Sequence, residues 1–238
     1  MPINHRHRCI FVHVPRTAGS SIEEALLGLD TTGAERDASN EAALFGVIPA
    51  EVRARRGIAA AYREWQHLPA AEVRRLLPAE IWHAYFKFSL VRNPWDRMVS
   101  WFCYADALAG RPAPGRRLMG ALHGRLSRGP SLRERFGAWL RDPQRNAGFL
   151  ADGRILREQV DWITDERGGC LVDFVGRYEN LHQDFQTLCR RFGVAVELPH
   201  VRRSERAPLA DYYDDETREL VRERHRRDIE AFGYAFEA

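Results

Sequence analysis

Lysine is almost absent from this chain: among 238 residues, Lys87 is the only lysine, although Lys and Arg together number 36. Asp and Glu number 33, so the formal net charge is only +3. That balance excludes a protein that coats a large polyanion through its overall charge, while it allows one basic pocket for a small anionic ligand. Charge that serves a function must therefore be concentrated at one place.

Long apolar runs are also absent. No run reaches the roughly 18 residues that a membrane-spanning helix requires. The first apolar run, Cys9 to Val14, is too short for the core of a signal peptide. We therefore expect a soluble, cytoplasmic protein that does not engage a membrane.

Cysteine is scarce and scattered along the chain. The four cysteines form no C-x-x-C pair and no zinc-like spacing with histidine. They are Cys9, Cys103, Cys170 and Cys189. We expect buried free thiols and no bound metal ion.

Strand and helix patterns alternate along the chain, and 45% of the residues are hydrophobic, enough to bury a core. Apolar runs predict strands at Cys9–Val14, Phe86–Val91 and Leu171–Val175. Helical spacing predicts helices at Ile22–Leu29, Ala70–Leu77, Trp95–Phe102, Leu132–Leu140, Leu181–Phe192 and Leu220–Phe232. The alternation predicts one α/β domain over residues 1–238, with a mostly parallel sheet flanked by helices and ligand sites beyond the carboxyl ends of its strands.

The segment Pro15–Ser21, which we call the cradle, follows the first predicted strand and opens a helix. It offers backbone N–H groups, three hydroxyls and the cation of Arg16 to a phosphate or sulfate. It lacks the G-x-x-x-x-G-K-[ST] spacing of a Walker A loop, which disfavours a nucleoside triphosphatase. The alternative is a plain helix start, capped by Ser20 or Ser21, with Glu23 and Glu24 in the first turn.

A second turn follows the second predicted strand. Arg92 stands at the end of that strand, and Ser100 lies two helical turns into the next helix. A guanidinium fork and a hydroxyl can together hold a second phosphate. Taken alone, the two residues are better explained as ordinary surface or helix-packing residues.

Together the two segments resemble the nucleotide-binding motifs of sulfotransferases that use 3′-phosphoadenosine-5′-phosphosulfate (PAPS), especially the carbohydrate group with the heparan 2-O- and chondroitin-type enzymes. The family's F-V-H-V-P-K-T-A/G-G-[ST]-S-I motif stands here as Phe11–Ile22, with Arg16 at the lysine position. Its F-x-x-V-R-N-P-x-x-R-x-x-S motif matches Phe88–Ser100 throughout. Val175–Leu181 and Asp228–Tyr234 extend the resemblance over nearly the whole chain.

This resemblance implies a P-loop-like sulfotransferase domain. Such an enzyme moves the sulfuryl group of PAPS to an acceptor hydroxyl, here on a saccharide, and leaves adenosine 3′,5′-bisphosphate without needing a metal. The implied nucleotide-binding residues are Pro15, Arg16, Thr17, Ala18, Gly19, Ser20, Ser21, Arg92, Ser100, Arg203 and Ser204. Arg16 would also act catalytically, by stabilising charge on the leaving phosphate.

The acceptor hydroxyl needs a general base, and His67 is the candidate because relatives place a histidine in a similar H-x-x-A/P-x-x-L pattern. A helix-start or surface histidine is the alternative. His13, in the first predicted strand, is better explained by core packing, and His83 has no matching motif. Acceptor choice would lie in residues 31–65 and in the loop 109–130.

Two other functions stay open. A nucleotide-dependent kinase of the P-loop type would need magnesium and ATP, and the missing Walker lysine argues against it. A non-enzymatic polyanion-binding protein would use the basic loop Arg111–Arg128, but the small net charge disfavours nucleic acid as a partner. The acidic run Asp214–Glu216 is better explained as a helix cap than as a metal site.

Overall fold

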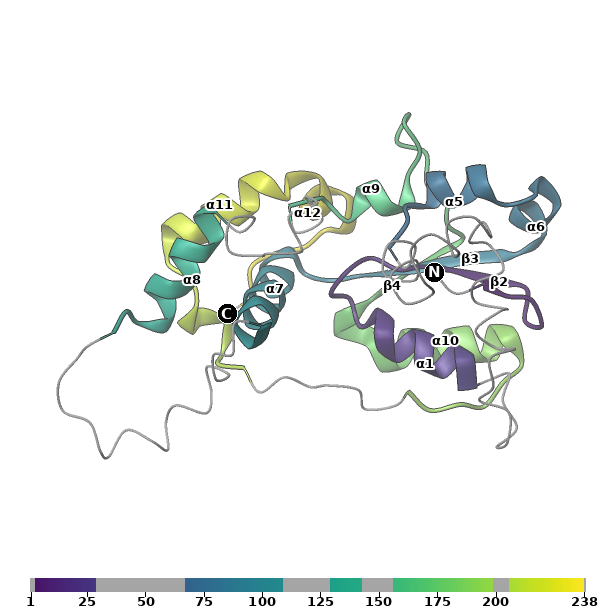
Figure 1. Cartoon of the computed structure of the whole chain (residues 1–238), viewed down its shortest axis with the longest axis horizontal. Coiled ribbons are helices and arrows are strands. Elements are labelled where there is room, and N and C mark those ends of the chain that lie inside the picture. Colours follow the sequence, from purple (N-terminus) through teal and green to yellow (C-terminus); the bar gives the residue numbers. More distant parts are fainter. Residues whose placement is uncertain (1–2, 29–66, 109–128, 143–155, 199–205, 238) are drawn as a thin grey trace. The chain divides into compact units, whose positions relative to one another are not determined.

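The computed structural model describes residues 3–28, 67–108, 129–142, 156–198 and 206–237 (Figure 1). The chain forms two compact units. Unit 1 comprises residues 1–91 and 159–201, and unit 2 comprises residues 92–158 and 202–238. The segment 31–65 and most of the loop 109–130, to which the sequence assigned acceptor choice, lie outside the described residues. The single domain expected over residues 1–238 stays a prediction.

Unit 1 is built on a four-stranded sheet of order β1-β2-β3-β4. The strands are β1 (Ile3–Asn4), β2 (Cys9–Val12), β3 (Phe86–Val91) and β4 (Phe174–Arg177). β1 runs antiparallel to β2, whereas β2, β3 and β4 are parallel to one another. The mixed α/β class with a mostly parallel sheet is therefore confirmed.

Helices cover both faces of this sheet (Figure 1). On one side lie α1 (Gly19–Gly28) and α10 (Leu181–Phe192), and on the other lie α5 (Ala70–Leu76), α6 (Ala79–Ala84) and α9 (Val160–Ile163). Phe11 and Phe88 from neighbouring strands stack with ring centroids 5.1 Å apart, in one apolar cluster with Ile22 and Leu188 from the first pair of helices. Since both faces are covered, the central strands are mostly apolar, as parallel strands usually are, with Lys87 and Ser89 of β3 as polar exceptions.

Unit 2 is helical in its described part. It contains α7 (Pro94–Leu108), α8 (Leu132–Arg141), α11 (Asp215–Arg224) and α12 (Arg226–Phe232). Their core is aromatic: Phe136 contacts Phe102 and Tyr212 edge-on, with ring centroids 5.4 Å and 5.6 Å away. Such edge-to-face pairs add to the free energy gained from burying the rings.

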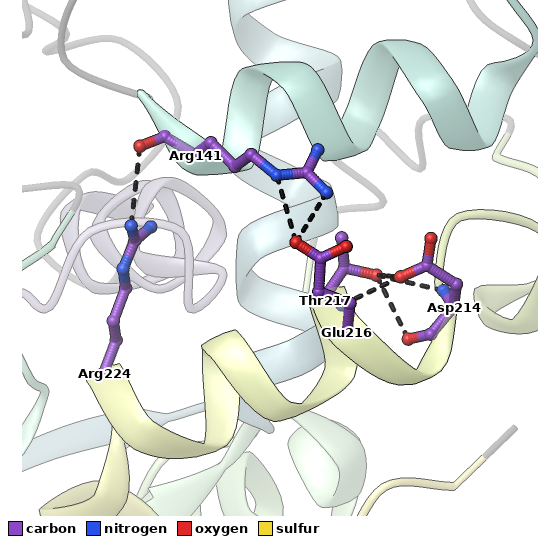
Figure 2. A network of polar contacts seen from close by, with 5 residues as sticks. All are labelled: Arg141, Asp214, Glu216, Thr217 and Arg224. Atoms are coloured by element: carbon purple, nitrogen blue, oxygen red, sulfur yellow. Dashed lines mark hydrogen bonds and ion pairs between the residues drawn. The ribbon is translucent and has the colours of Figure 1, made fainter.

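Polar contacts join α8 to α11 (Figure 2). The guanidinium of Arg141 pairs with Glu216 at 2.8 Å, and Arg224 donates to the backbone carbonyl of Arg141. Asp214 accepts from the backbone N–H of Thr217, whose hydroxyl accepts from the N–H of Asp214, which is a capping box. The acidic run therefore begins a helix, as its sequence predicts.

Several elements differ from the sequence-based expectation. The third strand is Phe174–Arg177 instead of Leu171–Val175, because Leu171 donates its N–H to Ile163 in a separate contact. The last helix is two helices, α11 and α12, which meet at His225. Cys9 and Cys189 are buried free thiols, but Cys170 is exposed.

The start of the first helix also differs. α1 begins at Gly19, so Ser20 and Ser21 lie inside the helix and are not its N-cap. No acidic residue occupies its first turn. Glu23 is buried instead of interacting with the helix dipole at the surface, whereas Glu24 is exposed.

Candidate functional site

Two residues of the cradle have a backbone conformation that residues other than glycine rarely adopt. Between the end of β2 and the start of α1, Arg16 has φ +70° and Ala18 has φ +67°. Left-handed φ angles in non-glycine residues cost energy and gather at functional sites. When they alternate with right-handed residues, successive N–H groups turn toward one concave side, where an anion can bind.

The first turn of α1 supplies backbone donors. The N–H groups of Ser21 and Ile22 bond back to the carbonyl of Ala18, at 3.0 Å and 3.3 Å. Within the part of the chain that the structure describes, no acceptor lies opposite the N–H groups of Gly19 and Ser20. These two groups carry the positive end of the helix dipole and suit a phosphate.

The cradle hydroxyls differ from one another. Thr17 is buried and its hydroxyl donates to the carbonyl of Val14 at 2.9 Å, so in this state it offers a ligand only acceptor lone pairs. Ser21 is buried, and Ser20 is exposed. Of the three, Ser20 is the hydroxyl that a solvent-borne ligand reaches directly.

A histidine and a glutamate form a buried pair beside the cradle. His13 follows β2, and its Nδ1 lies 2.8 Å from Oε1 of Glu23 on α1. A Cβ built on Gly19 would lie 1.8 Å from Nε2 of His13, so the edge of the ring occupies the space of that missing side chain. Position 19 must therefore be glycine for this ring to pack against the start of the helix.

His67 belongs to the same unit and lies at the same place, although 54 positions separate it from His13. The two rings meet edge to face with centroids 4.3 Å apart, and Nδ1 of His67 is 3.0 Å from the backbone carbonyl oxygen of His13. A carbonyl oxygen can only accept, so Nδ1 carries the hydrogen. In the neutral ring the lone pair is then on Nε2, which is the arrangement that a general base needs.

Neighbouring elements fix the backbone of His67. The indole N–H of Trp162, on α9, donates to its carbonyl oxygen at 3.3 Å. Pro69 is the N-cap of α5, which begins at Ala70. His83 lies on α6 with its side chain exposed, and no contact among the described residues links it to the cradle.

The second motif lies in unit 2. Arg92 is buried, and its Nε and Nη2 donate to one carboxylate oxygen of Asp96, at 2.7 Å and 2.6 Å. The other oxygen of Asp96 accepts from Arg206 at 2.7 Å. Two arginines thus share the carboxylate of Asp96, and guanidinium forks of this kind also bind phosphates.

Ser100 lies one turn beyond Asp96 on the same face of α7, since residues four apart are neighbours on a helix. It is buried. Arg203 and Ser204 lie outside the described residues. In unit 2 the structure thus places Arg92 against Asp96 at the start of α7, and Ser100 one turn further along that helix.

Sequence reasoning missed three contributors. The sequence suggested that Glu23 interacts with the helix dipole and that His13 packs in the core. Their contact was not predicted, because no sequence pattern indicates that the two side chains meet. Arg206 was not singled out, although it lies only two residues beyond Ser204. The one available signal was its position directly after the arginine and serine expected to bind the nucleotide.

The described residues show neither a membrane-spanning helix nor a metal-binding cluster. They contain no helix long and apolar enough to cross a bilayer. Nor do they hold three His, Cys, Asp or Glu side chains grouped as a metal ion would require.

Comparison with known proteins assigns the family. The sequence model described as the sulfotransferase family matches residues 1–235. Searches of curated proteins and of solved structures gave no match. The family match covers nearly the whole chain and agrees with the α/β fold and its mostly parallel sheet. The chain is therefore a transferase that belongs to the sulfotransferase family.

Proposed function

We propose that this sulfotransferase moves the sulfuryl group of PAPS to an acceptor hydroxyl on a saccharide, with His67 as general base. The observation that carries the proposal is the contact between His67 and His13, with Nδ1 and the carbonyl oxygen 3.0 Å apart. Through this contact, a histidine whose Nε2 can accept a proton lies beside the start of α1, where backbone N–H groups suit an anion. That combination is what sulfuryl transfer to a hydroxyl requires.

The residues present fit the two ends of the donor. In unit 1, Arg16 and the N–H groups of Gly19 and Ser20 suit the 5′-phosphosulfate. In unit 2, Arg92 would hold the 3′-phosphate with Ser100. Arg206 would help there, because it shares Asp96 with Arg92 and keeps the carboxylate from cancelling the charge.

When bound, PAPS supplies the sulfuryl group, whose bond to the 5′-phosphate oxygen breaks with its electron pair left on that oxygen. Nε2 of His67 takes the proton of the acceptor hydroxyl while the hydroxyl oxygen forms its bond to sulfur. Such a base is worth about 10²- to 10⁴-fold in rate. Arg16 and the helix-start N–H groups stabilise the charge that develops on the leaving phosphate.

The first test is calorimetric binding of adenosine 3′,5′-bisphosphate, AMP and ATP without added metal. We expect the bisphosphate to bind tightly to the wild type and about 10²-fold more weakly to Arg92→Ala, since a lost charged hydrogen bond costs up to about 3 kcal/mol. The matched control is Arg222→Ala, another arginine of unit 2, which is exposed and paired with Glu219. Its affinity should equal that of the wild type.

Two results would contradict the proposal. If Arg92→Ala bound the bisphosphate as tightly as the wild type, Arg92 would not be part of a 3′-phosphate subsite. Preference for ATP, strengthened by magnesium, would instead support the kinase alternative. Incubation with PAPS and a panel of saccharides, with release of the bisphosphate as readout, then tests the acceptor class.

A further inference from the structure

The His13–Glu23 pair is buried where apolar side chains would fit. The two side chains are 4% and 6% exposed, and the ring of His13 also stacks on Phe11 with centroids 5.4 Å apart. Replacing a buried polar pair by apolar residues is often neutral or stabilising, so stability is a weak reason for such a pair to be present. Its contacts indicate another role.

His13 touches both halves of the proposed site in unit 1. One edge of its ring lies on Gly19, the first residue of α1, and its backbone carbonyl accepts from Nδ1 of His67. Glu23 lies one turn further along the same helix and holds Nδ1 of His13 at 2.8 Å. The pair therefore connects the end of β2, the start of α1 and His67.

We propose that the His13–Glu23 pair is a positioning device for His67, an inference that rests on the proposed function. The carboxylate fixes the ring of His13, and that ring is the wall against which His67 stands edge-on. The carbonyl of His13 keeps the hydrogen of His67 on Nδ1. When Nε2 takes a proton, the positive charge forms close to a ring that is already paired with a carboxylate. Metal-ligating histidines are oriented by carboxylates in a comparable way, and loss of that carboxylate lowers metal affinity or activity about 10- to 100-fold.

The test is Glu23→Gln, which keeps an oxygen acceptor but removes the charge. With the best saccharide of the panel, we expect kcat to fall about ten-fold or more while the KM for PAPS and the affinity for adenosine 3′,5′-bisphosphate stay within about two-fold. In His67→Ala the same substitution should cause no further loss, because the residue through which it acts is gone. Glu24→Gln, next to it and exposed on the same helix, is the matched control and should behave as the wild type.

A readout without turnover separates this inference from the proposed function. The side-chain ¹⁵N spectrum, with the His67 signal identified from its loss in His67→Ala, should show the Nδ1–H tautomer in the wild type. In Glu23→Gln the ring of His13 is no longer held by a carboxylate, so the ring of His67 that stands against it can turn away from the His13 carbonyl, and the spectrum should show a mixture of tautomers. If the wild type binds no bisphosphate, the proposed function fails, and the spectrum still decides whether the pair orients His67.

Two results would overturn the inference. One is an unchanged kcat and spectrum in Glu23→Gln. The other is an equal loss of kcat in the wild-type and His67→Ala backgrounds, which is the mark of a purely structural pair. If Glu23→Gln does not fold, His13→Asn takes its place with the same expectations, because its amide N–H can reach Glu23 but supplies no ring beside His67.

Discussion

Arg16 is the residue at which this chain departs from the family motif that it resembles. An ammonium is a compact point charge, whereas a guanidinium spreads its charge over a planar fork. The fork approaches a single bridging oxygen less closely, and the backbone of Arg16 is already left-handed, with φ +70°. The position therefore combines the cation that the proposed reaction needs with a side chain poorly shaped for one oxygen.

Arg16→Lys should raise kcat by about ten-fold, equivalent to about 1.4 kcal/mol of transition-state stabilisation. The measurement is the release of adenosine 3′,5′-bisphosphate from PAPS with the best saccharide acceptor. Arg16→Gln, which has no charge, should instead lose about 10²-fold or more. A lower rate in Arg16→Lys would mean that a second N–H of the guanidinium is used.

Ala18 has φ +67°, where the Cβ of an L-residue costs about 1–2 kcal/mol and glycine costs nothing. Ala18→Gly should therefore raise the free energy of unfolding, by about 1 kcal/mol, in urea titrations. Ala105→Gly, inside α7, is the matched control and should lower it by about 1 kcal/mol. Equal destabilisation by both substitutions would show that the cradle is not strained at Ala18.

At the scale of elements, helices and strands with a clear local sequence pattern were predicted well, whereas elements that depend on contacts with other elements were not. β3 and α10 have the bounds that their patterns predict, since each is a long apolar or amphipathic run with clear ends. α6 was not predicted because it is only six residues long and follows α5 after two residues, although Pro78 stands at its N-cap. β4 was displaced because hydrogen bonding to β3, not apolar content, decides which residues form the strand.

The start of α11 offers a prediction about a helix cap (Figure 2). Asp214 accepts from Thr217, and these hydrogen bonds lower the pKa of its carboxyl. Asp214→Ala should cost about 1 kcal/mol of unfolding free energy at neutral pH, measured in urea. Because the pKa is lowered in the folded state, the contribution is present above the unfolded pKa near about 4 and shrinks as the pH falls through the folded value.

The control for this cap is Asp215→Ala, on the first residue of the helix. The side chain of Asp215 is exposed and pairs with Arg218 at 3.1 Å. Exposed pairs of this kind contribute about 0–1 kcal/mol, so the control should change stability little. A loss as large as that of Asp214→Ala would mean that charge near the helix end, not the cap hydrogen bond, is what stabilises α11.

At the scale of the whole molecule, the candidate site residues were predicted from motifs, whereas contacts between distant parts of the chain were not predicted. The cradle and Arg92 come just after strands, and Ser100 lies in the helix that follows Arg92, so their spacing can be compared with a motif along the chain. His67 was proposed as the base only through the resemblance, and that role stays a prediction. The His13–Glu23 contact and the bond from Arg206 to Asp96 join residues 10 and 110 positions apart, and no periodicity predicts such contacts.

His225 links the stability of the molecule to pH. Its side chain is fully buried between α11 and α12, and its pKa is lowered from 6.5 to about 3, first by burial and then by the charges of Arg97 and Arg224. The carboxylate of Asp228, 3.9 Å from Nδ1, is too far for a hydrogen bond and does not offset these effects. The ring is therefore neutral in the folded protein at physiological pH.

The unfolded chain protonates His225 near its ordinary pKa of 6.5, whereas the folded chain does so only near about 3. Its stabilising effect is thus complete above the unfolded pKa and is lost as the pH falls toward the folded value, by about 1.4 kcal/mol per pH unit. His225→Leu should remove about 2 kcal/mol of the difference in unfolding free energy between about pH 7 and about pH 5, measured in urea. An unchanged difference in that variant would mean that His225 is charged in the folded protein or that other groups carry the pH dependence.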